Sequence, residues 1–150
     1  MTRKQQRMER IRAVEREYLV ALVAARGLDE RFRTDPSALV AERLEFADHR
    51  NFRDNLEATY LIRLFAEFEA GLREAWEFAF RRTTVPSVRD LIDSLHAQCS
   101  ITDAWRDCVH DIRTNRNALV HEGGGDVQPV GMREACGWLC RFYSRVPHNW

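Results

Sequence analysis

Apolar side chains recur every three or four residues along most of the chain, which is the spacing of one face of an α-helix. The strongest such pattern spans residues 54–82 and predicts one long helix that carries much of the aromatic bulk of the core. Its apolar positions are Leu56, Tyr60, Leu64, Phe65, Phe68, Leu72, Trp76 and Phe80. Gly71 interrupts this helix either as a tolerated weak point or as a site of close packing.

Weaker patterns before this segment predict two more helices. Residues 2–26 repeat apolar positions at helical spacing, and Gly27 is the expected stop of that helix. Asp35-Pro36-Ser37 is typical of a helix start, which predicts a second helix. The expected apolar side of the second helix consists of Leu39, Val40, Leu44 and Phe46.

The C-terminal part of the chain carries clear helix-start signals. The long helix must end before Pro86, and Ser87 with Asp90 resembles a capping box that opens the next helix. Thr102 is the expected N-cap of another helix, which runs to Val120. Two shorter helices are therefore expected after the long one.

Three glycines, Gly123 to Gly125, are expected to end that helix with a left-handed cap, and a last helix follows at about residues 130–143. No stretch alternates apolar and polar residues with period two, so no sheet is expected. The sequence predicts an all-α fold, a compact bundle of five or six helices around the long aromatic-rich helix. All 150 residues are assigned to one domain, with a core at about 55–143 and an N-terminal helical extension at 1–50.

The composition is that of a globular domain with a charge-rich surface, because 45% of the residues are hydrophobic and 31% are charged. The formal net charge is zero, so binding to nucleic acid would need a local basic patch. The apolar run at 18–25 is far shorter than the roughly 20 residues that span a bilayer, and no signal peptide is apparent. A cytoplasmic protein with no membrane partner is expected.

The chain has four cysteines, at 99, 108, 136 and 140, which are expected to be reduced thiols in the cytoplasm. Cys136 and Cys140 lie one helical turn apart, a spacing that can hold a metal ion. The chain has no matching pair elsewhere, which favours two core thiols instead. No metal and no cofactor are expected.

Side chains that bind phosphate and transfer protons gather near the end of the helix that runs to Val120. Arg113, Asn117 and His121 are four residues apart and share one helix stripe, with Arg116 beside it. Arginine neutralises charge on phosphate oxygens, histidine exchanges protons near neutral pH, and asparagine orients either group. Because a ribose 2′-hydroxyl is already held beside its phosphate, this set suits metal-free cleavage of RNA.

The hexapeptide Arg116-Asn117-Ala118-Leu119-Val120-His121 resembles the Arg-(polar)-x-x-x-His signature of the HEPN superfamily. These helical domains occur in many prokaryotic RNases of toxin–antitoxin and antiviral systems. The order of elements over roughly residues 55–143 is similar too: a long helix, the motif late in a later helix, small residues after the histidine, and one further helix. The resemblance implies that Arg116, Asn117 and His121 are catalytic, and that two helix ends share a composite active site in a homodimer.

In such a dimer, two copies of His121 would divide the roles of base and acid, and two copies of Arg116 would clamp one phosphate. The products implied are a 2′,3′-cyclic phosphate and a 5′-hydroxyl. Glu69 is a candidate for the acidic residue that often accompanies the motif, where it would pair with Arg116 or with the supporting residue Arg113. A solvated surface carboxylate is the alternative for Glu69.

Two classes of function follow from these residues. In the first, the protein is an endoribonuclease that acts as a toxin or antiviral-defence effector, with an antitoxin or defence-system protein as partner. In the second, it is a non-catalytic helical dimer that binds RNA or a protein partner. The motif also has a purely structural interpretation, in which His121 interacts with the helix dipole and Arg116 pairs with Asp111 or Glu122.

Overall fold

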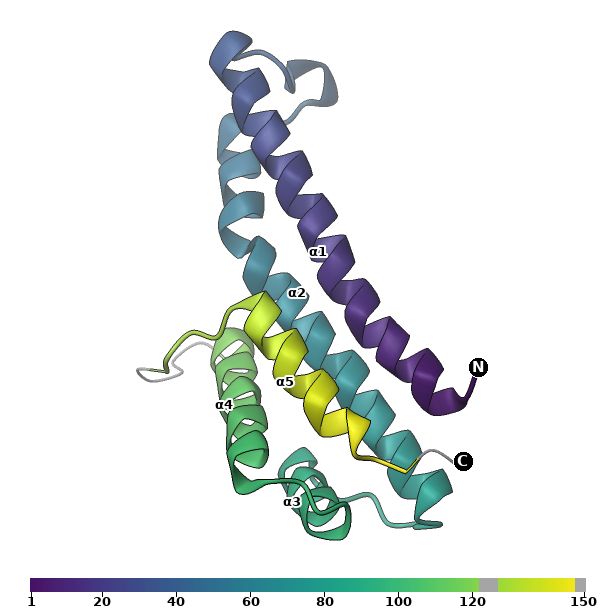
Figure 1. Ribbon diagram of the computed structural model, residues 1–150. Helices are drawn as coiled ribbons and strands as arrows, with labels where there is room; N and C mark the ends of the chain where they lie inside the picture. The colour runs from purple at the N-terminus through teal and green to yellow at the C-terminus, as the bar shows by residue number, and fades with distance from the viewer. Residues whose placement is uncertain (122–126, 148–150) are drawn as a thin grey trace.

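The computed structural model describes residues 1–121 and 127–147, and the arrangement of its helices is shown in Figure 1. The described residues form helices and no β-strand, which confirms the predicted all-α bundle. The five α-helices are α1 (Arg3–Thr34), α2 (Phe46–Glu74), α3 (Val88–Gln98), α4 (Asp103–Val120) and α5 (Met132–Ser144). Two short elements flank α2, a 3₁₀ turn η1 (Val40–Glu42) and a π-helical turn η2 (Ala75–Ala79).

The first helix is longer than predicted, because α1 continues through Gly27 to Thr34. Gly27 is exposed, and a β-carbon at this position would meet nothing within 4 Å. A glycine inside a helix costs only about 1 kcal/mol, which burial of Phe32 in the next turns of α1 offsets. The predicted stop at Gly27 is therefore wrong, and α1 ends at the Asp35 cap, directly before Pro36.

The predicted helix start at Asp35-Pro36-Ser37 is also wrong. This segment forms a turn in which an Asp35 carboxylate oxygen accepts from the backbone amide of Ser37 at 3.0 Å and from its hydroxyl at 2.6 Å. The single turn η1 follows, and α2 begins at Phe46 rather than at residue 54. The four expected apolar positions do not share a helix face, and Val40, Leu44 and Phe46 are exposed.

The core surrounds the second half of α2, which packs against α1, α4 and α5. Its fully buried residues include Leu64, Phe65, Phe68 and Leu72. A β-carbon at Gly71 would lie 2.6 Å from Cγ of Arg7 and 3.0 Å from Cε2 of Tyr143. Gly71 is thus a close-packing site where α1 and α5 approach α2. The helical path ends at η2, slightly earlier than the predicted residue 82.

The helix starts predicted for the C-terminal half are confirmed. The Ser87 hydroxyl oxygen accepts from the backbone amide of Asp90 at 3.1 Å, and the Thr102 hydroxyl oxygen accepts from that of Trp105 at 3.4 Å. Residues 123–125, expected as the cap after α4, lie outside the described residues. None of the helices in the described ranges has the length and apolar character needed to cross a bilayer.

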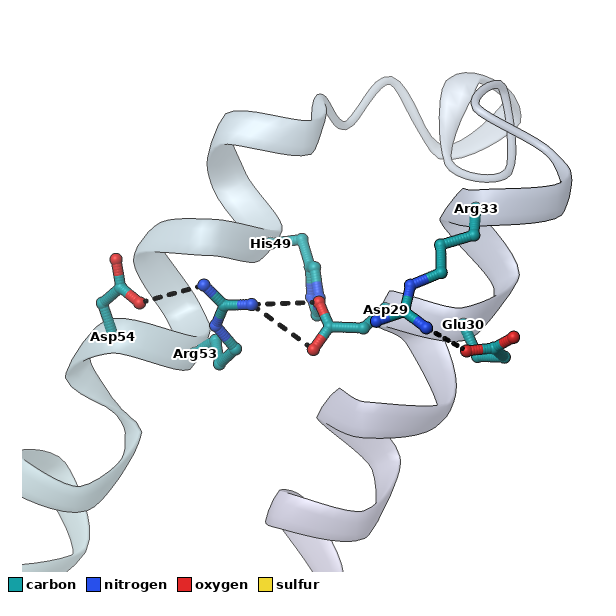
Figure 2. A network of polar contacts seen from close by, with 6 residues as sticks. All are labelled: Asp29, Glu30, Arg33, His49, Arg53 and Asp54. Carbon is teal, nitrogen blue, oxygen red and sulfur yellow. Dashed lines mark hydrogen bonds and ion pairs between the residues drawn. The ribbon is translucent and has the colours of Figure 1, made fainter.

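The C-terminal half of α1 and the N-terminal half of α2 extend beyond the other three helices as a two-helix hairpin (Figure 1). A polar network joins the two helices there, as Figure 2 shows. The buried His49 ring contacts a carboxylate oxygen of Asp29 through Nε2 at 2.8 Å, and Arg53 donates to the same carboxylate at 3.3 Å. Phe32 packs edge-on against Phe46 beside this network.

Candidate functional site at the end of α4

The residues of the predicted motif occupy the last two turns of α4 and its cap. Arg113, Arg116 and Asn117 lie within α4, and His121 is the residue at which the helix ends. The backbone amide of His121 donates to the carbonyl of Asn117 at 3.0 Å, so the backbone step from Asn117 to His121 is still helical. Val109 and Ile112, one turn before Arg113 and Arg116, are buried, and Arg113, Arg116 and Asn117 are half-buried, so the motif side chains lie at the edge of the core side of α4.

The two arginines of the site have no acidic partner among the described residues. Arg116 donates from Nη1 to the side-chain oxygen of Asn117 at 2.9 Å. The Nε atoms of Arg113 and Arg116 are buried and have no hydrogen-bond partner within residues 1–121 and 127–147. The expected alternative pairing of Arg116 with Asp111 is absent from these contacts, and Glu122 lies outside the described residues. Two guanidinium groups are therefore available to an anion at this helix end.

His121 and Asn117 supply the neutral polar groups of the site. His121 is exposed and has an extended backbone, with φ −108° and ψ 119°, so the chain leaves the helical path of α4 at this residue. Its side chain makes no hydrogen bond or ion pair with another described residue. Because the Asn117 oxygen accepts from Arg116, the amide NH₂ of Asn117 remains a donor. The group thus combines a cation, an amide donor and an imidazole open to solvent.

Glu69 does not make the pairing expected of it. Its carboxylate accepts from Arg73, at 3.0 Å from Nε and 2.8 Å from Nη2. Arg73 lies one turn further along the same helix and also donates to the carbonyl of Pro86 at 3.2 Å. A partner at this spacing needs no tertiary contact, and it holds Glu69 away from Arg116 and Arg113.

Two residues that hold the surroundings of the site were not singled out from the sequence. Asn115 is only 6% exposed, and its side-chain amide donates to the carbonyl of Gln128 at 3.0 Å. Glu57 of α2 accepts from the backbone amide of Met132 at 2.9 Å, at the start of α5. Both contacts fix the segment that returns from α4 to α5. The sequence did contain a signal for Asn115, because its spacing of three residues from the apolar Ile112 places it on the core side of α4.

Comparisons of the chain with protein-family models, with curated proteins and with solved structures gave no match. The resemblance to the HEPN superfamily therefore depends on the residues at the end of α4 and on the order of the helices, and it stays a prediction. No cluster of three or more metal-ligating side chains occurs among the described residues.

Proposed function

We propose that this protein is a metal-independent endoribonuclease with a HEPN-like active site at the end of α4. One observation carries the proposal: Arg113 and Arg116 have no carboxylate partner among the described residues and lie within two turns of the exposed His121. A guanidinium group carries five N–H donors, so an arginine without a carboxylate partner keeps donors for an anion. The ligand that suits two guanidinium groups is a phosphate.

The reaction follows from the chemistry of these groups. An RNA 2′-hydroxyl attacks the adjacent phosphorus, its proton passes to an imidazole, and the bond to the 5′-oxygen breaks as that oxygen takes up a proton. Arg116 stabilises the negative charge that develops on the non-bridging oxygens, and the amide NH₂ of Asn117 orients the phosphate. The products are a 2′,3′-cyclic phosphate and a 5′-hydroxyl.

A second copy of the chain completes the site in this proposal. One imidazole cannot accept one proton and donate another in the same step, whereas two copies of His121 divide the roles. Leu119 and Val120 support a contact between copies, because they are 44% and 45% exposed directly before His121. Covering two adjacent exposed apolar side chains removes apolar surface from water, which favours contact with a second copy. The proposed dimer is therefore a homodimer with two α4 ends facing each other.

The proposed biological setting is the cytoplasm, where the enzyme acts as a toxin or antiviral-defence effector on cellular or invading RNA. An unrestrained ribonuclease damages its own cell, so an antitoxin or defence-system protein is the proposed regulatory partner. The HEPN resemblance supports this setting, since many of its RNases belong to such systems.

The test is RNA cleavage in the presence of EDTA. Wild-type protein, Arg116→Ala and His121→Ala are incubated with total RNA, and new 5′-hydroxyl ends are labelled directly with a polynucleotide kinase. Loss of a positioned acid–base group or of a charge clamp reduces such reactions by about 10²- to 10³-fold, so both variants should be nearly inactive. His96→Ala and Arg50→Ala are matched controls, because His96 pairs with Asp103 on a different surface and Arg50 is exposed on α2.

The outcomes separate the proposal from its alternative. Cleavage that persists in EDTA, disappears in both site variants and survives in both controls supports the ribonuclease. Wild-type protein that binds RNA or a protein partner without cutting any RNA would instead indicate the non-catalytic helical dimer. Equal cleavage by wild type and variants indicates a contaminating nuclease and overturns the assignment.

A further inference from the structure

A second group of reactive side chains lies where α1 packs against α5. An open hollow of about 560 Å³ is lined by residues of these two helices, among them Cys136 and Cys140. The thiols come from successive turns of α5 and face the same hollow. Four arginines also line it, whereas Glu15 is the one acidic residue of its lining. The hollow therefore combines two thiols with a positively charged rim.

The two thiols have different surroundings. Cys136 is 4% exposed. Its hydrogen bond with Cys140, then burial, and then the nearby Glu15 raise the pKa of Cys136. Cys140 is half-buried. The hydrogen bond from the Cys136 thiol, together with the charge of Arg12, lowers the pKa of Cys140 to about 7 despite its burial. Cys140 is thus the sulfur that is stabilised as a thiolate, and Cys136 is the donor that holds it.

The charges of the rim indicate the kind of molecule that enters. Arg12 and Arg133 make no ion pair with other described residues, while Arg16 pairs with Glu9 and Arg141 stacks over Trp138. Arg12 faces the Cys140 thiolate, and the four arginines of the lining outnumber its one carboxylate, so the rim attracts a small molecule that carries carboxylates. The volume of the hollow is within the range of small-molecule sites.

We propose that Cys140 is a nucleophilic thiol that exchanges with small anionic disulfides at the α1–α5 hollow, with Cys136 and Arg12 as positioning residues. The Cys140 thiolate attacks one sulfur of the disulfide, a new sulfur–sulfur bond forms, and the old one breaks. The electron pair leaves with the departing thiolate, which takes a proton from water. The product is one mixed disulfide on Cys140, and this reaction is independent of the proposed nuclease activity.

Cys136 does not displace the adduct by forming an internal disulfide. β-carbons four residues apart on a helix are separated by about 5–6 Å. A disulfide needs about 3.5–4.5 Å between them, so a Cys136–Cys140 bond would require α5 to unwind. Leu139 and Phe142 of α5 are completely buried in the core, which opposes that unwinding. The mixed disulfide is therefore expected to persist.

The experiment uses the full chain with oxidised glutathione as the anionic probe and cystamine as the cationic probe. Intact and peptide mass spectrometry are expected to find one glutathione adduct, on Cys140, formed at least about fivefold faster than on Cys99 or Cys108. Burial raises the pKa of Cys99 and of Cys108 and so disfavours their thiolates. Cys140→Ser should abolish the rapid adduct, and Cys136→Ala, which removes the thiol donor, should slow it without moving it to another site.

Arg12→Ala tests the role of charge, since Arg12 is exposed and its loss leaves the core intact. The rate ratio of oxidised glutathione to cystamine is expected to fall about threefold or more in Arg12→Ala and to stay unchanged in Arg50→Ala. A purely structural role of Arg12 would change both rates together. Equal labelling of all four cysteines, an internal Cys136–Cys140 disulfide, or an unchanged ratio in Arg12→Ala would each overturn the proposal.

Discussion

The tip of the α1–α2 hairpin and the end of α4 each place a histidine close to arginines, but the two groups differ in their partners. In the hairpin, the side chain of His49 is 1% exposed and contacts Asp29, which also accepts from Arg53 (Figure 2). At the end of α4, His121 is exposed, and Arg116 has only the neutral Asn117 as partner among the described residues.

This difference separates a structural network from a candidate site. In the hairpin network, Arg53 and His49 lie beside the carboxylate of Asp29, so the guanidinium group has a counter-charge, although the buried Nδ1 of His49 has no hydrogen-bond partner among the described residues. The end of α4 keeps two guanidinium groups without a carboxylate in the described ranges. Residue type alone does not distinguish the two groups; the absence of a counter-charge does.

The largest expected effect comes from giving the end of α4 the counter-charge that the hairpin already has. Asn117→Asp places a carboxylate where Arg116 now donates to an amide oxygen, and the resulting ion pair competes with phosphate. RNA cleavage should fall by about 10²- to 10³-fold, as for loss of the charge clamp. Circular dichroism should show an unchanged helix content.

Asp has nearly the same shape as Asn, so Asn117→Asp changes the charge of the site and little else. Asn117→Ala removes the amide without adding a charge, so it is expected to keep more activity than Asn117→Asp. If the acidic variant cleaves RNA as fast as the wild type, an open guanidinium is not what the site requires.

A second prediction breaks the hairpin network instead. His49→Ala removes a buried ring that packs near Phe32 and Phe46 and leaves Asp29 without its shortest contact. The free energy of unfolding should fall by about 2–3 kcal/mol, through a cavity and a lost hydrogen bond. Urea denaturation measures this loss. RNA cleavage at temperatures where the variant is folded should equal that of the wild type, and a selective loss of activity would show that the hairpin takes part in the site.

A third prediction concerns the stability of the hairpin at low pH. The hydrogen bond from His49, with a further contribution from Arg53, lowers the pKa of Asp29 below its usual value. A carboxyl group with a lowered pKa in the folded state stabilises the fold above its unfolded pKa, near 4, and loses this contribution as the pH falls through the lower, folded value. The hairpin should therefore weaken below about pH 4. Stability measured against pH should show a smaller slope there in Asp29→Asn, and an identical slope would contradict the assignment.

The sequence predicted the helices that are defined by local signals. Ser87 and Thr102 cap helices because their hydroxyl groups reach backbone amides three residues away, a contact that depends on nothing else in the fold. The common stripe of Arg113 and Asn117 follows from helix geometry in the same way. Such features need only a local backbone conformation, so a single sequence contains them.

Features that depend on tertiary packing were not predictable. Gly27 and Pro36 suggested a break after residue 26, but pairing of α1 with α2 favours eight more residues of helix. The Glu69–Arg73 pair is the exception, since it is a local contact four residues apart that the sequence did contain. Asn115 and Gln128 are joined across a segment whose path the sequence does not specify.

The smallest expected effect is that of Gly27→Ala in the hairpin, and Gly71→Ala in the core of the bundle is its counterpart. Gly27→Ala in the hairpin adds a methyl group where nothing lies within 4 Å, so it should raise the free energy of unfolding by about 0.5–1 kcal/mol through better helix propensity. Gly71→Ala in the bundle forces a methyl group against Arg7 and Tyr143 and should lower stability instead, by about 1–3 kcal/mol. Thermal unfolding of the two variants measures both shifts. If the free energy of unfolding rises in Gly27→Ala and falls in Gly71→Ala, the hairpin has free space around α1 and the bundle does not. Changes in the same direction would contradict that distinction.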